Sequence, residues 1–171
     1  MNITMILLRL VHLFSAFIWV GTTFAMALFI GPTAQAIGAD AQKFMQHFLM
    51  RSNLTKITTA TGILTVLSGL SIYGYLFNGG LAPLNSGSGL ALTVGGLAGI
   101  GALSVGLGMG RTIRRMRAVS AEIAKAGGPP KPEQLANLGK LQEKLARAGA
   151  INTILMSVAL VGITLSEYFA F

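Results

Sequence analysis

Three ionisable side chains lie inside or at the edge of long apolar stretches, and their types make them the first candidates for chemistry: Arg9, His12 and Glu167. Arg9 and His12 are three residues apart, so they share one face of a helix. An ionisable group within a membrane costs a few kcal/mol and is a functional candidate for that reason. If the first and last helices run antiparallel, we expect Arg9 and Glu167 to form an ion pair. The alternative is that both side chains extend to the water interface.

Trp19 follows His12 by seven residues, on the same helix face and about 10 Å further along the helix. Neutral imidazole is an iron ligand, and a porphyrin favours apolar and aromatic walls. The stripe therefore suits a porphyrin, with His12 as the candidate iron ligand and with Arg9 and Trp19 on the same helix face. A histidine that is hydrogen-bonded to a neighbouring helix is the structural alternative.

The second apolar stretch is rich in threonine near its beginning. If residue 30 of the first helix lies level with residue 40 of the second, His12 lies level with Thr58. Thr58 is therefore expected to line the same site, because threonine hydroxyls hydrogen-bond across helices or to their own backbone.

A second histidine, His47, would then lie about 16 Å from His12 along the membrane normal, which argues against a bis-histidine haem. Met45 and Met50 flank His47. This soft set is suited to Cu(I), and methionines that only fill a core are the alternative.

The elements that must position these residues follow from composition. Of the 171 residues, 53% are hydrophobic and only 11% are charged, whereas soluble domains carry about 25% charged residues. Residues 10–39, 57–110 and 148–166 contain no Asp, Glu, Lys or Arg. Since a helix needs about 20 apolar residues to cross a bilayer, these stretches predict one, two and one spans. The composition excludes a soluble enzyme, a disordered chain and, because Cys is absent, a disulfide scaffold.

We therefore predict one all-α domain over residues 1–171, a four-helix transmembrane bundle in contact with the lipid bilayer. The spans are placed at about 4–30, 55–77, 89–110 and 149–171. The first helix is expected to stop at Gly31-Pro32. The second is expected to begin near Ala39, to stay polar up to Lys56 and then to run apolar to about Phe77. Residues 111–148 are expected to form a helical hairpin that turns at 127–130.

The distribution of basic residues predicts the orientation. Twelve of the 13 Lys and Arg residues fall in the connections between spans one and two and between spans three and four, and the remaining connection carries none. Those two connections lie on one side of an antiparallel bundle, which should be cytoplasmic, with both termini outside. The net charge of +8 is then a consequence of topology, so no nucleic-acid partner is expected.

The third span is rich in glycine. Gly95, Gly99, Gly106 and Gly110 are spaced so that they share one face. Small residues at such spacing let helices approach closely in lipid. The face is expected to pack against a neighbouring helix of this chain, of a second copy or of another membrane subunit. The alternative is room for a flat cofactor or a lipid tail.

The stretch from Leu10 to Gly21, with His12 and Trp19 followed by small residues, resembles the first-span signature of a group of bacterial four-helix membrane proteins. The group includes the CopD-like copper-resistance domain and the HemJ-type protoporphyrinogen IX oxidases. Two further segments are similar to members of the group: Met50-Arg51 ahead of Thr58, Thr59 and Gly62, and the last helix from Leu135 to Tyr168. In the HemJ-type enzymes the matching histidine ligates haem b, so the resemblance implies the same role for His12. Those enzymes also carry a Lys in their third span, and residues 89–110 contain none.

Three functions remain open at this point. The first is a haem-binding protein of the bacterial inner membrane that takes part in electron transfer or porphyrin redox chemistry. The second is a non-catalytic accessory subunit of a larger, respiratory-type membrane complex. The third is a copper-handling membrane protein. The sequence contains no hydrolase motif and no phosphate-binding glycine loop, so whether the chain is an enzyme stays open.

Overall fold

The computed structural model describes residues 2–80 and 84–168, and within α3 it omits the side chains of Ala39, Gln42, Lys43, Gln46, Met50 and Arg51. The described part contains helices and no strand. The elements are α1 (Ile3–Ala25), the π-helical segment η1 (Met26–Ile30), α2 (Gly31–Ile37), α3 (Ala39–Arg51), α4 (Leu54–Leu76), α5 (Gly87–Ala126) and α6 (Pro132–Tyr168). The last three residues of the predicted fourth span, 169–171, lie outside the described residues.

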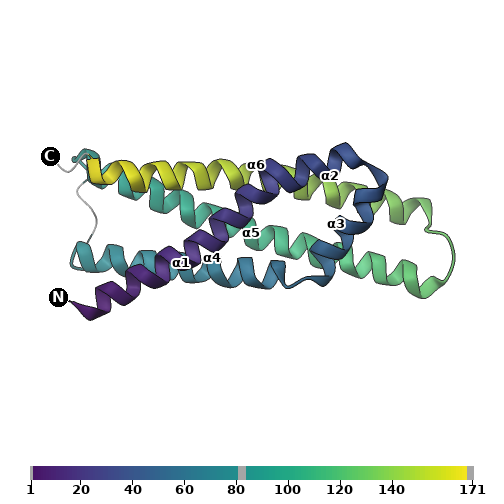
Figure 1. Cartoon of the computed structure of the whole chain (residues 1–171), viewed down its shortest axis with the longest axis horizontal. Helices are drawn as coiled ribbons and strands as arrows, with labels where there is room; N and C mark the ends of the chain where they lie inside the picture. The colour runs from purple at the N-terminus through teal and green to yellow at the C-terminus, as the bar shows by residue number, and fades with distance from the viewer. Residues whose placement is uncertain (1, 81–83, 169–171) are drawn as a thin grey trace.

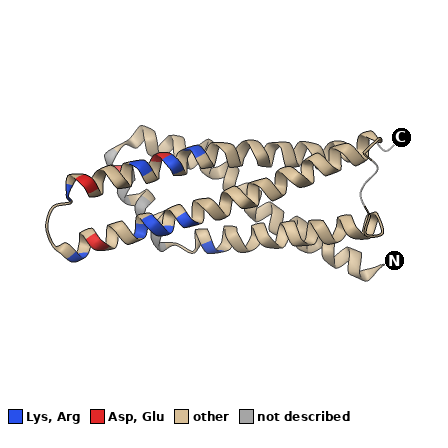
Figure 2. Ribbon diagram, turned by 180° about the vertical axis from the view of Figure 1, so that it is seen from behind, with Lys and Arg blue, Asp and Glu red and all other residues tan. Residues whose placement is uncertain are grey.

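Four helical stretches are long and apolar enough to cross a membrane: Ile3–Ile37, Leu54–Leu76, Gly87–Ala126 and Pro132–Tyr168. This confirms the predicted all-α four-helix bundle. Both ends of the chain lie at one end of the bundle, which we call the terminal end, and the turn between α5 and α6 lies at the other (Figure 1). We call that second end the basic end, because Lys and Arg of the α5–α6 hairpin gather toward it (Figure 2).

The first helix does not stop at Gly31-Pro32, so that prediction was wrong. The backbone N–H of Gly31 donates to the carbonyl of Met26, five residues back, which widens the helix by one residue. Pro32 then stands at the beginning of α2, where its missing N–H is tolerated. The continuous helix that begins at Ile3 ends only at Gly38, whose φ of 73° is a conformation that favours glycine.

The second helix is broken where one continuous helix was predicted. Ser52 is extended, with φ −74° and ψ 165°, and its Oγ accepts a hydrogen bond from the N–H of Leu54 at 3.1 Å. The hydroxyl of Ser52 thus binds the first N–H of α4, one residue before the N-cap Asn53. The polar segment α3 and the apolar helix α4 are therefore separate elements.

The α5–α6 hairpin forms as predicted, with Gly127 in the left-handed conformation after α5. The two helices pack along each other and come into backbone contact at Gly95 and Gly162. A Cβ at Gly162 would lie 2.8 Å from the carbonyl oxygen of Ala91 and 2.9 Å from Cα of Gly95. This is the close approach that small residues allow within lipid.

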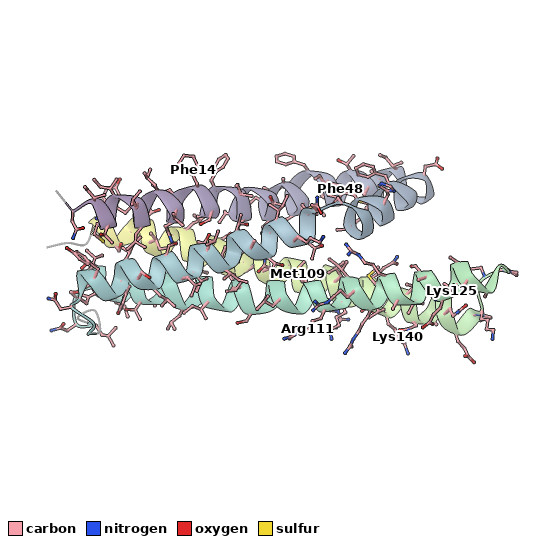
Figure 3. The ribbon with its side chains drawn as sticks, turned by 90° about the horizontal axis from the view of Figure 1, so that it is seen from below. Phe14, Phe48, Met109, Arg111, Lys125 and Lys140 are labelled. Carbon is pink, nitrogen blue, oxygen red and sulfur yellow. The ribbon has the colours of Figure 1, made fainter. Side chains whose placement is uncertain are left out.

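The four long helices meet at one cluster. Trp19 of α1, Ala102 of α5 and Met156 of α6 form its buried core, and Val66 of α4 packs against it. Away from this cluster most large apolar side chains point outward. Phe14, labelled in Figure 3, is an example, and 70% of this residue is exposed. An exterior of this kind suits a lipid environment.

The contact between Gly95 and Gly162 leads to the first prediction. Gly162→Ala should lower the free energy of unfolding by about 1–3 kcal/mol, because the added methyl forces the two backbones apart. Gly99→Ala is the control, since a Cβ there meets nothing within 4 Å and alanine favours the helix. Unfolding of the purified chain in mixed micelles measures both variants. Equal effects of the two substitutions would contradict the packing.

Candidate functional site

The imidazole of His12 lies between α1 and α4. Its Nδ1 is 2.9 Å from the carbonyl oxygen of Thr65 and 3.2 Å from Oγ of Ser68. A carbonyl oxygen can only accept, so Nδ1 carries the proton and Nε2 carries the lone pair. Nε2 makes no hydrogen bond with any residue that the structure describes, and the side chain is half-buried.

The ring of His12 fits against a glycine of α4. A Cβ at Gly69 would lie 2.9 Å from Cε1 of His12 and 3.3 Å from Nδ1. Gly69 thus permits the short distance between imidazole and backbone on which the hydrogen bond to Thr65 depends. This contact and that hydrogen bond fix the ring orientation.

His12 belongs to a polar seam that continues along the contact between the two helices. Ser15 of α1 is buried, and its Oγ accepts a hydrogen bond from Oγ1 of Thr65 at 3.0 Å. The same hydroxyl of Ser15 donates to the carbonyl of Val11, and that of Ser68 donates to the carbonyl of Leu64. Such bonds between polar side chains hold helices together where the hydrophobic effect does not act.

Trp19 lies two turns from His12 on the same face, as predicted, but it does not adjoin the imidazole. It packs against another glycine of α4, Gly62, where an added Cβ would lie 3.0 Å from the indole. Only 6% of Trp19 is exposed. Its role in the structure is to join α1 to the other three helices.

Thr58 does not lie level with His12. The residues that contact His12 are Thr65, Ser68 and Gly69, about two helical turns from Thr58, whose hydroxyl donates to the carbonyl of Leu54 of its own helix. The assumed register was wrong because the first helix continues past residue 30 through η1 and α2. The spacing of Thr58, Thr61, Thr65 and Ser68 by three and four residues is the signal that could have indicated the seam.

The expected ion pair between Arg9 and Glu167 is not formed. Both side chains are exposed, and the salt bridge found among the described residues joins Arg147 to Glu143 within α6. Arg9 and Glu167 lie toward the terminal end, and an ion pair between exposed side chains gains little free energy. Arg9 is therefore not held beside His12 by a carboxylate.

The described residues give no support to a copper site at His47. His47 is exposed on α3, the side chain of Met50 lies outside the described ones, and no cluster of three His, Cys, Asp or Glu occurs in the described part of the chain.

The glycines of α5 divide between two neighbours and do not form one tight face. Gly95 contacts the backbone of α6, Gly110 lies near Cγ2 of Thr55 on α4, and Gly99 and Gly106 have no atom within 4 Å of a Cβ position. A seven-residue step drifts around a straight helix by about 20°. The predicted common face therefore turns from one partner toward another along α5.

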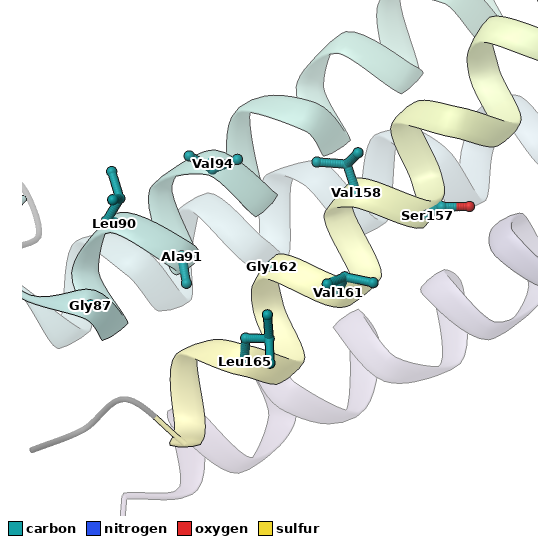
Figure 4. A pocket seen from close by; sticks show the side chains of 9 residues that line it. All are labelled: Gly87, Leu90, Ala91, Val94, Ser157, Val158, Val161, Gly162 and Leu165. Carbon is teal, nitrogen blue, oxygen red and sulfur yellow. The ribbon is translucent and has the colours of Figure 1, made fainter.

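An apolar groove of about 620 Å³ opens between the terminal-end halves of α5 and α6. Leu90, Ala91 and Val94 line it from α5, and Val158, Val161 and Leu165 line it from α6 (Figure 4). Its lining contains no ionisable side chain.

The chain matches no protein-family model, no curated protein and no solved structure. Its class follows from the fold alone. Four apolar helices of spanning length and an apolar exterior define a multi-pass helical membrane protein.

The contact between Gly69 and His12 leads to the second prediction. Gly69→Ala should displace the imidazole and lower the free energy of unfolding by about 1–2 kcal/mol. In the His12→Ala background the same substitution should cost much less, because the ring that it displaces is gone. A double-mutant cycle measures the difference, with Gly74→Ala as control, since a Cβ at Gly74 meets nothing within 4 Å. Strictly additive effects of Gly69→Ala and His12→Ala would contradict the contact.

Proposed function

We propose that this protein binds haem b, with His12 as axial ligand, and takes part in electron transfer or porphyrin redox chemistry. The observation that carries the proposal is the state of the imidazole. Nδ1–H is bound to a backbone carbonyl and Nε2 has no partner among the described residues. Histidines that ligate metals typically have this arrangement, because the bond at Nδ1 fixes the tautomer and raises the basicity of Nε2.

The residues around His12 fit an iron ligand in two further respects. The carbonyl of Thr65 and Oγ of Ser68 accept from Nδ1, and Gly69 lets the Cε1–Nδ1 edge of the ring approach α4, so Nε2 is oriented before any ligand arrives. The chain offers one histidine at this level. His12 would hold the haem through Nε2, and the haem would supply one-electron chemistry.

We further propose that the protein lies in the bacterial inner membrane with its basic end in the cytoplasm and both termini outside. The support is the concentration of Lys and Arg at the basic end (Figure 2), which follows the positive-inside rule.

A second candidate function is that of an accessory subunit in a larger membrane complex. The observation that favours it is the outward-facing groove between α5 and α6, which would accept an apolar helix from another subunit without loss of any charge interaction.

The haem proposal predicts a Soret band in the full chain after expression with ample haem and purification in mild detergent. His12→Ala should abolish or shift this band, because it removes the proposed iron ligand. His47→Ala is the matched control and should leave the spectrum unchanged, since His47 is exposed on α3. Wild-type protein without a Soret band would overturn the proposal. A band that is identical in His12→Ala would overturn the assignment of the ligand.

The proposed orientation predicts the activity of reporter fusions. Alkaline phosphatase fused after residue 171 should be active, because it folds only outside the cytoplasm, whereas the same enzyme inserted at Gly128 should be inactive. Fluorescent protein inserted at Gly128 should give the converse signal. The reverse pattern would contradict the orientation that the basic residues predict.

A further inference from the structure

Asn152 is buried in the bundle without a hydrogen-bond partner. Only 4% of the residue is exposed, its Oδ1 is fully buried and unpaired, and its carboxamide makes no hydrogen bond with the described residues. A buried amide without partners costs about 1–3 kcal/mol. A leucine would fill this position in an apolar core at no such cost, so the amide requires an explanation.

The contacts between α5 and α6 place Asn152 along the bundle. Leu155 lies against Gly101, and Cε of Met109 lies 3.9 Å from the Cβ position of Gly149. Asn152 is therefore opposite the stretch of α5 between Gly101 and Met109. It lies one turn from Met156 toward the basic end, directly beneath the cluster that contains Trp19.

The other buried polar atoms without partners lie in the same half. Among the described residues these atoms are Oγ1 of Thr55, Nε of Arg117 and Oγ of Ser120. Thr55 lies beside Gly110, and Arg117 donates through Nη2 to the carbonyl of Leu49 at 2.8 Å. By contrast, in the seam on the terminal side of Trp19 the hydroxyls of Ser15, Thr65 and Ser68 and Nδ1 of His12 all make hydrogen bonds, while Nε2 of the half-buried His12 has no partner among the described residues.

The same half of the bundle also has room between two of its helices. Leu103 and Gly110 of α5 both contact α4, at Gly62 and Thr55. Gly106 lies between them on the same face of α5, three residues after Leu103 and four before Gly110. Yet a Cβ at Gly106 would meet nothing within 4 Å. The two helices therefore leave space at the level of Asn152.

We propose that the basic half of the bundle is a hydrated vestibule, open at the basic end and closed by the Trp19, Ala102 and Met156 cluster, in which Asn152 binds water at the closed end. Water suits this place because a buried water makes about three hydrogen bonds to polar groups that would otherwise be unsatisfied. A carboxamide both donates and accepts, so it can hold water molecules in a chain that leads toward Thr55 and Arg117. The vestibule admits small hydrogen-bonding solutes from the basic end as far as Asn152. It requires neither haem nor a particular orientation in the membrane.

The absence of cysteine from the chain permits a clean accessibility test. Asn152→Cys, Ala102→Cys and Ser15→Cys are made in the full chain, reconstituted in vesicles and treated with a charged methanethiosulfonate from either side. Only the thiolate attacks the sulfur of the reagent and displaces its sulfinate, and the thiolate forms where water reaches the cysteine. Gly128→Cys, in the α5–α6 turn, identifies the side on which the basic end lies.

We expect Asn152→Cys to react at least about tenfold faster than the two controls, and only from the side on which Gly128→Cys reacts. Ala102 is the control for depth, being 0% exposed in the closing cluster, and Ser15 is the control for polarity, being 5% exposed in the satisfied seam. Reaction of Asn152→Cys no faster than Ala102→Cys, or reaction from the opposite side, would overturn the proposal.

A second measurement remains informative if Asn152→Cys does not fold. Asn152→Leu replaces the amide with an apolar side chain of similar size. In a hydrated vestibule this change places an apolar group in water, so the midpoint of unfolding should stay the same or fall. In a dry core it removes an unpaired polar group and the midpoint should rise. A higher midpoint for Asn152→Leu than for the wild type would overturn the vestibule.

Discussion

The close packing of the Trp19 indole against Gly62 of α4 is the contact on which the arrangement of the bundle depends. The α1–α4 pair and the α5–α6 pair are each held by contacts along their length. Among the described residues, the buried core that the two pairs share is the cluster in which Trp19 meets Ala102 and Met156. Lipid offers no hydrophobic driving force between helices, so close packing must hold the two pairs together. The large flat side chain of Trp19 against Gly62, Ala102 and Met156 provides it.

This central cluster separates two polar regions of different character. On the terminal side, the hydroxyls and Nδ1 of His12 bond to one another and to backbone carbonyls, which fixes His12 in one tautomer and leaves Nε2 without a partner among the described residues. On the basic side, four buried polar atoms have no hydrogen-bond partner in the described part of the chain. The proposed haem ligand and the proposed vestibule thus lie on opposite sides of Trp19, and each can be tested without the other.

The sequence predicted the features that depend on composition and spacing. Uncharged stretches predicted the four spans, and the seven-residue step placed His12 and Trp19 on one face. It could not predict the partners of His12, because these depend on how far the first helix continues past Pro32, and a π-helical turn has no clear sequence signal. Nor could it distinguish Asn152 from other polar residues, since the lack of a partner is a property of the packed bundle.

The continuation of the first helix through η1 and α2 also bears on how the protein fits its bilayer. Its 35 residues form a rod of about 52 Å, whereas the hydrocarbon layer is about 30 Å thick. A rod of this length tilts or extends beyond the hydrocarbon, and α1 runs obliquely to α5 and α6 (Figure 1). Because the π-helical turn lets this helix continue beyond the thickness of the hydrocarbon layer, the tilt of the helix that carries His12 depends on membrane thickness as well as on its packing against the other helices.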